Sequence, residues 1–277
     1  MRIALLGGVD GNWATMLRSG GHVLTSIWTA GGGQIGEITA SLAAEHHCPV
    51  FFHRLCHDDL VALKQAGTEL VVVVGYPWLV PVDPALPAVN VHPSLLPDGR
   101  GPAPVQWILS THPDAAGVTI HKLTAEADAG DILAQEPMTL TAADDLHTVF
   151  ARTYWRSAQM MAAILSDFPR AWAAAAPQSG TGRWTADHPE VFTIGAATQV
   201  GEALHHWRAF GPGLVAWDGV DQGGPDRNTH RTRWVAAVRG WREPHGLVPG
   251  TVASDDGRIT MLAVADGFLL IEADTAG

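Results

Sequence analysis

Positive charge is scarce in this sequence of 277 residues, and lysine is almost absent. The only lysines are Lys64 and Lys122, and 17 basic residues stand against 28 acidic ones, for a formal net charge of −11. Nucleic-acid binding depends on clustered positive charge, because contacts with phosphates supply most of the non-specific affinity. The composition therefore disfavours a nucleic-acid partner.

Cysteine is equally rare. Cys48 and Cys56 match neither the Cys-x-x-Cys redox pair nor the spacing of a zinc site. We expect two buried, reduced thiols. His205 and His206 are adjacent, and neighbouring residues on a helix do not face the same way, so no metal-binding pair is expected there.

Long apolar runs are missing as well, and none approaches the ~18 residues of a membrane span. The N-terminal residues pass directly into a strand pattern, without the longer apolar stretch of a signal peptide. With 47% hydrophobic and 16% charged residues, the composition is that of a globular protein. We expect a soluble cytoplasmic protein with no membrane partner.

Short apolar runs alternate with amphipathic stretches in the first part of the chain. The run at 70–74 is fully apolar, which is typical of a parallel strand covered on both faces. Strands alternating with helices predict an α/β fold with a doubly wound, mostly parallel sheet. Strands are predicted at 3–6, 22–29, 49–52, 70–74 and 89–92, with an edge strand at 131–140, and helices at 12–18, 37–47, 58–66 and 145–166.

A change of pattern follows residue 176. Residues 177–189 are rich in Gly, Ser, Thr and Pro, and the periodicity after residue 210 switches to short strands with turn signals. These features predict an α/β domain at 1–176, a linker at 177–198 and a small C-terminal β-domain at 199–277.

One strand carries polar side chains on a single face. Successive strand residues point to opposite faces, so Val89 and Val91 can face the core while Asn90 and His92 share the other side. Pro93 biases His92 towards extended backbone and ends the strand, which places His92 at the carboxyl edge, where ligands bind in open α/β sheets. A lone histidine at a strand end is also a common structural residue, so the pattern alone leaves both interpretations open.

Four motifs follow one another in this part of the sequence. They are Asn90-Val91-His92-Pro93-Ser94-Leu95-Leu96-Pro97, Arg100-Gly101, Gly117-Val118-Thr119 and Asp128-Ala129-Gly130-Asp131-Ile132. In this order they resemble the formyltransferases that use 10-formyltetrahydrofolate, which include methionyl-tRNA formyltransferase, glycinamide ribonucleotide transformylase, sugar and hydroxyornithine formyltransferases, and the hydrolase part of 10-formyltetrahydrofolate dehydrogenase. The C-terminal segment 247–252 resembles a Pro-Gly-Thr segment in the OB-like barrel of the same family.

The resemblance implies a formyltransferase fold, 10-formyltetrahydrofolate as co-substrate, and no metal. It implies that Asn90, His92 and Asp128 are catalytic, and the 36-residue interval from His92 to Asp128 matches the family. It implies that Ser94 and Arg100 contact the substrate, although an ordinary loop charge is an equally good interpretation of Arg100. The folate-binding residues that it implies are Tyr76, Trp78, Leu79, Val80, Leu95, Ala125, Glu126 and Ala127. For the loop from Tyr76 to Val80, an equally good interpretation is that its aromatic side chains pack under a turn stiffened by proline.

The expected chemistry is acyl transfer through a tetrahedral intermediate. It requires stabilisation of an oxyanion, removal of a proton from the attacking amine and delivery of a proton to the leaving nitrogen. Asn90 can donate to the oxyanion, and His92 can carry a proton near neutral pH. Asp128 can orient the imidazole and stabilise its cation.

The sequence does not identify the amine that accepts the formyl group. Methionyl-tRNA formyltransferases have a basic insertion after the second strand, whereas no Lys or Arg occurs here between Arg18 and Arg54, and residues 200–277 carry seven Arg against ten acids. We therefore expect a small amine, namely an amino sugar, an amino acid or a hydroxylamine, and place tRNA second. A 10-formyltetrahydrofolate hydrolase and a non-catalytic folate sensor are further alternatives, and a homodimer is compatible with the sequence.

Overall fold

The computed structural model describes residues 1–7, 11–31, 33–185, 191–211, 215–219 and 231–273. The chain divides into two compact units. Unit 1 comprises Met1–Pro104, Asp114–Leu140 and Phe150–Ala186, and unit 2 comprises Val105–Pro113, Thr141–Val149 and Asp187–Gly277.

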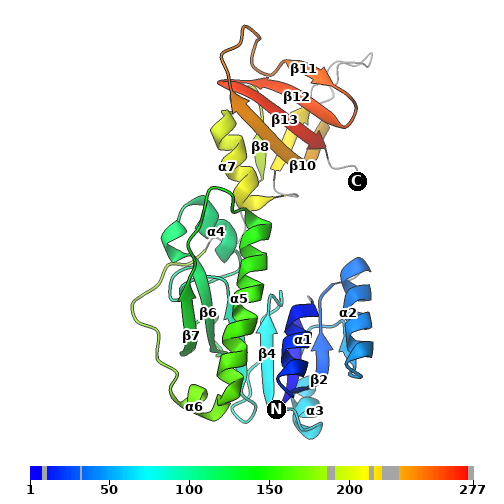
Figure 1. Ribbon diagram of the computed structural model, residues 1–277, viewed down its shortest axis with the longest axis vertical. Helices are drawn as coiled ribbons and strands as arrows, with labels where there is room; N and C mark the ends of the chain where they lie inside the picture. The colour runs from blue at the N-terminus through cyan, green and yellow to red at the C-terminus, as the bar shows by residue number, and fades with distance from the viewer. Residues whose placement is uncertain (8–10, 32, 186–190, 212–214, 220–230, 274–277) are drawn as a thin grey trace. The chain divides into compact units, whose positions relative to one another are not determined.

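Unit 1 is built on a seven-stranded sheet, with the strand order β3-β2-β1-β4-β5-β6-β7 (Figure 1). The neighbours from β3 to β5 pair in parallel, and β6 and β7 add antiparallel pairs at one side. The strands are β1 (Arg2–Gly7), β2 (Val23–Trp28), β3 (Val50–Phe51), β4 (Leu70–Val74), β5 (Ala88–His92), β6 (Gly117–Lys122) and β7 (Ile132–Pro137). The predicted doubly wound, mostly parallel sheet is confirmed, with the 131–140 segment at its edge.

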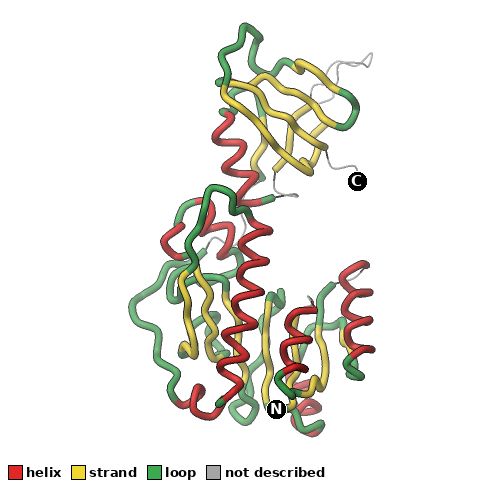
Figure 2. Tube along the Cα trace, in the orientation of Figure 1, coloured by secondary structure: helices red, strands yellow, loops and turns green. Residues whose placement is uncertain are grey.

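Helices cover both faces of this sheet, as the red segments of Figure 2 show. Side chains alternate between two cores: Ile3 and Leu5 join one, and Ala4 and Leu6 join the other. The apolar side chains along one side of α5 pack in the first core, and those of α3 pack in the second. The helices of the chain up to residue 173 are α1 (Gly11–Ser19), α2 (Gly33–Glu45), α3 (His57–Gln65), α4 (Pro104–Ser110), η1 (Pro113–Ala115), α5 (Leu146–Ser166) and α6 (Phe168–Ala173).

Unit 2 contains a six-stranded sheet with the order β11-β12-β13-β10-β9-β8. Its pairs are antiparallel except for β8 and β9, which run in parallel. The predicted small C-terminal β-domain is therefore confirmed. The elements are β8 (Phe192–Ile194), α7 (Val200–Phe210), β9 (Val215–Gly219), β10 (Arg231–Arg242), β11 (Val252–Asp255), β12 (Ile259–Val264) and β13 (Gly267–Ala273).

The segment predicted as a linker has structure at both of its ends. Residues 177–185 group with unit 1, and β8 is a strand of the unit 2 sheet. The three domain boundaries stay predictions about how the chain folds.

Two local expectations were wrong. Both cysteines are free, but neither is fully buried: Cys48 is half-buried, and Cys56 is exposed at the N-cap of α3, because the polar helix N-terminus faces solvent there. The α2 helix begins at Gly33, four residues before the predicted start at 37. In the described residues, none of the helices combines the length and apolar character needed to cross a bilayer.

Candidate active site

The β5 strand places two polar side chains beside each other at the carboxyl edge of the parallel sheet. Val89 and Val91 point into the core and are buried, as the two-residue period of a strand requires. Asn90 and His92 occupy the alternate positions, and the antiparallel neighbour β6 pairs His121 with Asn90 and Thr119 with His92. Strand geometry therefore gathers four polar side chains on one patch of the sheet.

Asp128 reaches this patch from the loop between β6 and β7. Its backbone has φ 53°, in the left-handed region that a non-glycine residue rarely adopts. The next turn requires Gly130, because an added Cβ there would lie 1.9 Å from the carbonyl oxygen of Lys122. The tight backbone of this loop turns the Asp128 carboxylate back towards β5.

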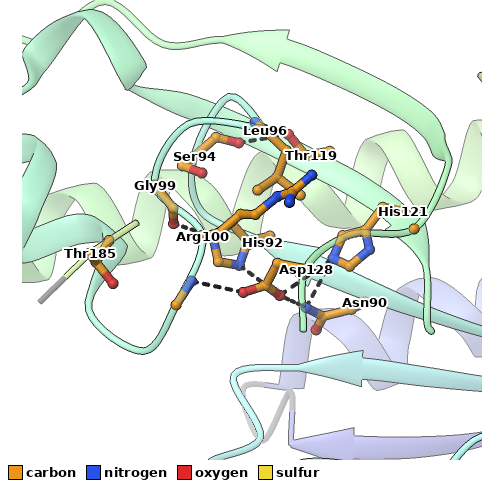
Figure 3. Close-up of polar contacts among 12 residues, drawn as sticks. Asn90, His92, Ser94, Leu96, Gly99, Arg100, Thr119, His121, Asp128 and Thr185 are labelled. Carbon is orange, nitrogen blue, oxygen red and sulfur yellow. Dashed lines mark hydrogen bonds and ion pairs between the residues drawn. The ribbon is translucent and has the colours of Figure 1, made fainter. Parts of the chain in front are cut away.

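The carboxylate of Asp128 lies among polar groups from three segments, as Figure 3 shows. Its Oδ1 is 3.4 Å from Nδ1 of His92 and accepts a hydrogen bond from Nδ2 of Asn90 at 3.3 Å. Its Oδ2 accepts from the backbone N–H of Gly101 at 2.9 Å. The imidazole Nε2 of His121 lies 3.7 Å from Oδ1.

Two backbone carbonyls determine which ring nitrogens carry hydrogen. A carbonyl oxygen only accepts, so Nε2 of His92 donates to the Gly99 oxygen at 2.7 Å, and Nδ1 of His121 donates to the Lys122 oxygen at 2.8 Å. In the neutral rings, the lone pair of His92 is then on Nδ1, facing Asp128. The lone pair of His121 is on Nε2, 3.2 Å from Nδ2 of Asn90, which can donate to it.

Burial and charge act in opposite directions on His92. Its side chain is 6% exposed, and desolvation lowers its pKa below the usual value, while the Asp128 charge and the Gly99 carbonyl favour the imidazolium and oppose that shift. The pKa of Asp128 is lowered to about 2: desolvation raises it, but the His121 and His92 rings, which in their protonated forms stabilise the carboxylate, together with the Gly101 N–H outweigh that effect. The neutral pH form of the site is therefore an ionised Asp128 beside a neutral His92.

All of the predicted folate residues except Leu95 lie in two loops, one after β4 and one after β6. Tyr76 follows β4, the parallel neighbour of β5; its hydroxyl accepts from the Leu55 N–H at 3.1 Å, and its ring meets Trp78 edge-on at 5.3 Å. Leu79 is 70% exposed, while Val80 packs against the second core. The other loop holds Ala125 and Glu126, which are exposed, and Ala127, which is half-buried, directly before Asp128.

Three further predicted residues lie in the turn after β5. The Ser94 side chain is fully buried, and its hydroxyl donates to the Asp98 carbonyl at 2.6 Å, so it shapes the turn. Leu95 is half-buried, and a Cβ on Gly117 would meet its Cδ2 at 2.3 Å, so Leu95 packs over β6. Arg100 is held by Gln178, with Nη2 donating to Oε1 at 2.7 Å, and its Nη1 lies 3.9 Å from Glu126.

Two residues of this arrangement were missed at the sequence level. His121 could have been found from the two-residue period of β6, which puts Thr119 and His121 on one face. Gln178 had no such signal, because it lies in a segment without periodicity, fifty residues from Asp128. Among the described residues, no group of three or more His, Cys, Asp or Glu side chains could hold a metal ion.

Chemically, the site offers amide donors and a buried imidazole that can take up or release a proton, each within 4 Å of the ionised carboxylate of Asp128. That set can stabilise a developing oxyanion and move a proton, which are the requirements of acyl transfer to an amine.

Comparison with known proteins gives a consistent result. A family model described as formyl transferase matches residues 52–165. Methionyl-tRNA formyltransferase of Listeria monocytogenes serovar 1/2a is 34% identical over 225 residues, which cover 77% of this chain and 67% of that protein. Alignments with other curated relatives are shorter, and the first four span 29% to 42% of the relatives' length.

Solved structures share the fold. HypX from Aquifex aeolicus in complex with tetrahydrofolic acid has a TM-score of 0.67 at 18% identity, over 98% of this chain and 43% of that one. A 4-N formyltransferase from Francisella tularensis has a TM-score of 0.65 at 15% identity, over 85% of this chain and 96% of that one.

Proposed function

Because this chain belongs to the family of formyltransferases that use 10-formyltetrahydrofolate, we propose that it transfers the formyl group of that folate to the amine of a small-molecule acceptor. The observation that carries the proposal is the convergence of Asn90, His92 and Asp128, with Asp128 Oδ1 within hydrogen-bonding reach of the other two side chains. A non-catalytic folate sensor would have no need of that arrangement.

In the proposed reaction, the amine nitrogen of the acceptor attacks the formyl carbon and forms a tetrahedral intermediate. The bond between that carbon and N10 of the folate then breaks, the amine loses one proton, and N10 gains one. The products are the formamide and tetrahydrofolate, and no oxidant or reductant is consumed.

His92 carries the proton in this scheme. Its Nδ1 bears the lone pair of the neutral ring, because Nε2 donates to Gly99. On accepting the proton of the amine, Nδ1–H faces the Asp128 carboxylate, which stabilises the imidazolium until the proton passes to N10. Burial keeps the ring neutral before the reaction, and Asp128 stabilises the charged state that forms during it.

Asn90 stabilises the oxyanion. Its two amide hydrogens face Asp128 Oδ1 and His121 Nε2 at 3.3 and 3.2 Å. Both distances are long for hydrogen bonds, so turning one N–H towards the formyl oxygen costs little. The exchange of a weak internal bond for a bond to a charged oxygen favours the tetrahedral state over the ground state.

We place the pterin of the folate against the loop from Tyr76 to Val80 and the segment from Ala125 to Ala127, with Leu95 completing the contact. Both loops flank the catalytic residues, and each offers exposed side chains or backbone. The Nε and Nη2 edge of the Arg100 guanidinium is held by Gln178, and Nη1, which lies 3.9 Å from the exposed Glu126, binds the acceptor. Ser94 supports the acceptor side indirectly, by shaping the turn that ends in Arg100.

A small acceptor agrees with the charge of the chain. The net charge of −11 and the stretch between Arg18 and Arg54 without Lys or Arg offer little for phosphates of an RNA stem to bind. Methionyl-tRNA is the second candidate acceptor, because the Listeria relative is named methionyl-tRNA formyltransferase.

Hydrolysis of 10-formyltetrahydrofolate to formate would use the same residues, with water as the nucleophile. The composition supports a cytoplasmic protein.

The test is a folate assay. Purified protein is mixed with 10-formyltetrahydrofolate, and the absorbance change on formation of tetrahydrofolate is followed with separate pools of amino sugars, amino acids, hydroxylamines and methionyl-tRNA. We expect turnover with one small-amine pool. Turnover only with methionyl-tRNA, or turnover without any acceptor, would replace the proposal with the second candidate or with the hydrolase.

A further inference from the structure

Residues 176–185, here called the strap, contact two parts of the candidate site. These are the turn after β5, which holds Gly99 and Arg100, and the loop between β6 and β7, which holds Asp128. The first residue pairs with the start of β7, since Ala176 and Ile132 exchange backbone hydrogen bonds of 3.0 and 2.8 Å. At the other end, the N–H of Gly99 donates to the Arg183 carbonyl at 2.8 Å, and the N–H of Thr185 donates to the Arg100 carbonyl at 2.7 Å. Thr185 is labelled beside Gly99 and Arg100 in Figure 3.

Gln178 is the strap residue that turns inward between exposed neighbours. Its Nε2 donates to the carbonyls of Asp128 and Gly130 at 2.7 and 2.9 Å. Its Oε1 accepts from Nε and Nη2 of Arg100 at 3.2 and 2.7 Å. One amide group thereby joins the backbone of the Asp128 loop to the side chain of Arg100.

The Asp128 loop needs such a tether. Asp128 holds a left-handed backbone that persists only where its surroundings determine it. Its carboxylate is bound by Gly101 and Asn90, but its own carbonyl has the Gln178 amide as partner. Without that amide, the loop keeps its side-chain contacts and loses a bond that fixes the peptide direction.

The strap is not a packing element. Residues 179–181 are exposed, and they are Ser, Gly and Thr, so this part of the strap buries little apolar surface. Its connections to the site are backbone pairs and polar side chains, such as Arg183 donating to Asp98 at 2.7 Å. Removing one of these connections disturbs geometry more than it disturbs the core.

We propose that Gln178 is a positioning residue, which holds Asp128 and Arg100 in the arrangement that formyl transfer requires. This inference rests on the function proposed above, and it goes beyond the catalytic residues, because Gln178 acts only through two other residues. It assigns a role in catalysis to a segment that the sequence marks as a linker.

The test compares Gln178→Ala and Gln178→Glu with wild type and with Gln159→Ala, an exposed glutamine of α5 as matched control. We expect Gln178→Ala to lower kcat at least tenfold, with the KM for 10-formyltetrahydrofolate changed less than twofold and the melting temperature close to wild type. Gln178→Glu keeps an acceptor for Arg100 but cannot donate to two carbonyls, so it should lose activity equally. Gln159→Ala should behave as wild type.

A second measurement of the effect of Gln178 does not depend on enzymatic turnover. The His92 imidazole is titrated by NMR, and we expect Gln178→Ala to move its pKa further down, because a displaced Asp128 stabilises the imidazolium less. Wild-type kcat in Gln178→Ala with an unchanged His92 titration would overturn the inference, as would activity retained in Gln178→Glu. If wild type itself transfers no formyl group, the proposed function fails, and the His92 titration still decides whether Gln178 positions Asp128.

Discussion

At the scale of single residues, the site depends on which atoms carry hydrogen. The Gly99 and Lys122 carbonyls select the tautomers of two buried histidines, and those tautomers decide where lone pairs meet the Asp128 carboxylate and the Asn90 amide. Main-chain groups therefore hold these side chains in the form that the proposed proton transfer requires.

Substitution of the proposed catalytic residues should abolish activity without unfolding the protein. We expect His92→Ala and Asn90→Ala each to lower kcat about a hundredfold or more, since general acid–base catalysis and oxyanion stabilisation each contribute on that order. Steady-state kinetics and circular dichroism check the result, with the exposed His57→Ala as control. Near-normal turnover in folded His92→Ala would remove His92 from the mechanism.

The pH profile should report His92. Because burial lowers its pKa and the neutral ring is the active form, kcat/KM should stay level around neutral pH and fall only below the ordinary histidine value of 6.5. In Asp128→Asn, the stabilising charge is gone, so the acid limb of the residual activity should move to still lower pH. An acid limb centred above 6.5 in wild type would contradict this assignment.

Asp128 should also affect stability in acid. Its pKa falls from 3.8 to about 2 on folding, so its contribution is complete above pH 3.8 and is lost as the pH falls through about 2. The shift corresponds to about 2 kcal/mol of unfolding free energy. Urea unfolding of wild type and Asp128→Asn at pH 5 and pH 2 measures it. An equal loss in both proteins would show that the carboxylate does not supply this stability.

The sequence predicted some residues of the candidate site and missed others. Two-residue periodicity was sufficient to put Asn90 and His92 on one face, because strand geometry is local. The place of Asp128 came from family resemblance, since a left-handed residue in a loop leaves no periodic signal. Gln178 could not be predicted, because its four hydrogen bonds all reach residues far away in sequence.

At the scale of elements, the β6–β7 loop determines where the carboxylate lies. The long helix predicted at 145–166 is observed at Leu146–Ser166, because caps and periodicity are local signals. Loops are determined by close approach between distant segments, such as Gly130 against Lys122.

Gly130→Ala should separate loop position from catalytic chemistry. The added Cβ would lie 1.9 Å from the Lys122 carbonyl, so the loop must move, and overpacking of this kind costs about 1–3 kcal/mol. We expect a lower melting temperature and at least tenfold lower kcat, although every catalytic side chain is retained. Gly195→Ala, where no atom lies within 4 Å of the new Cβ, is the matched control. Wild-type kcat in Gly130→Ala would mean that the loop position does not matter.

At the scale of the whole molecule, the negative net charge disfavours a polyanionic acceptor such as tRNA. Seventeen basic against 28 acidic residues produce a field that repels polyanions. Neither the fold nor the catalytic cluster identifies the acceptor, because the same residues suit any amine, and composition is the property that distinguishes the candidates.

Activity with the small acceptor should therefore be insensitive to tRNA. We expect less than a twofold change in kcat/KM on addition of uncharged tRNA at moderate salt, and little dependence of activity on ionic strength, since few phosphate contacts are made. Initial-rate measurements with a titration of tRNA check this. Competitive inhibition that weakens as salt rises would favour methionyl-tRNA as the acceptor.

The strap also determines where the gene can be recombined with those of relatives. A chimaera joined after Ala176 would combine the Asp128 loop of this chain with a foreign strap, and the two would not have evolved together. A crossover after Thr185 keeps every strap contact described above within one parent. Libraries that recombine family members should therefore place the junction there, so that each chimaera keeps the proposed catalytic residues and the strap from one parent.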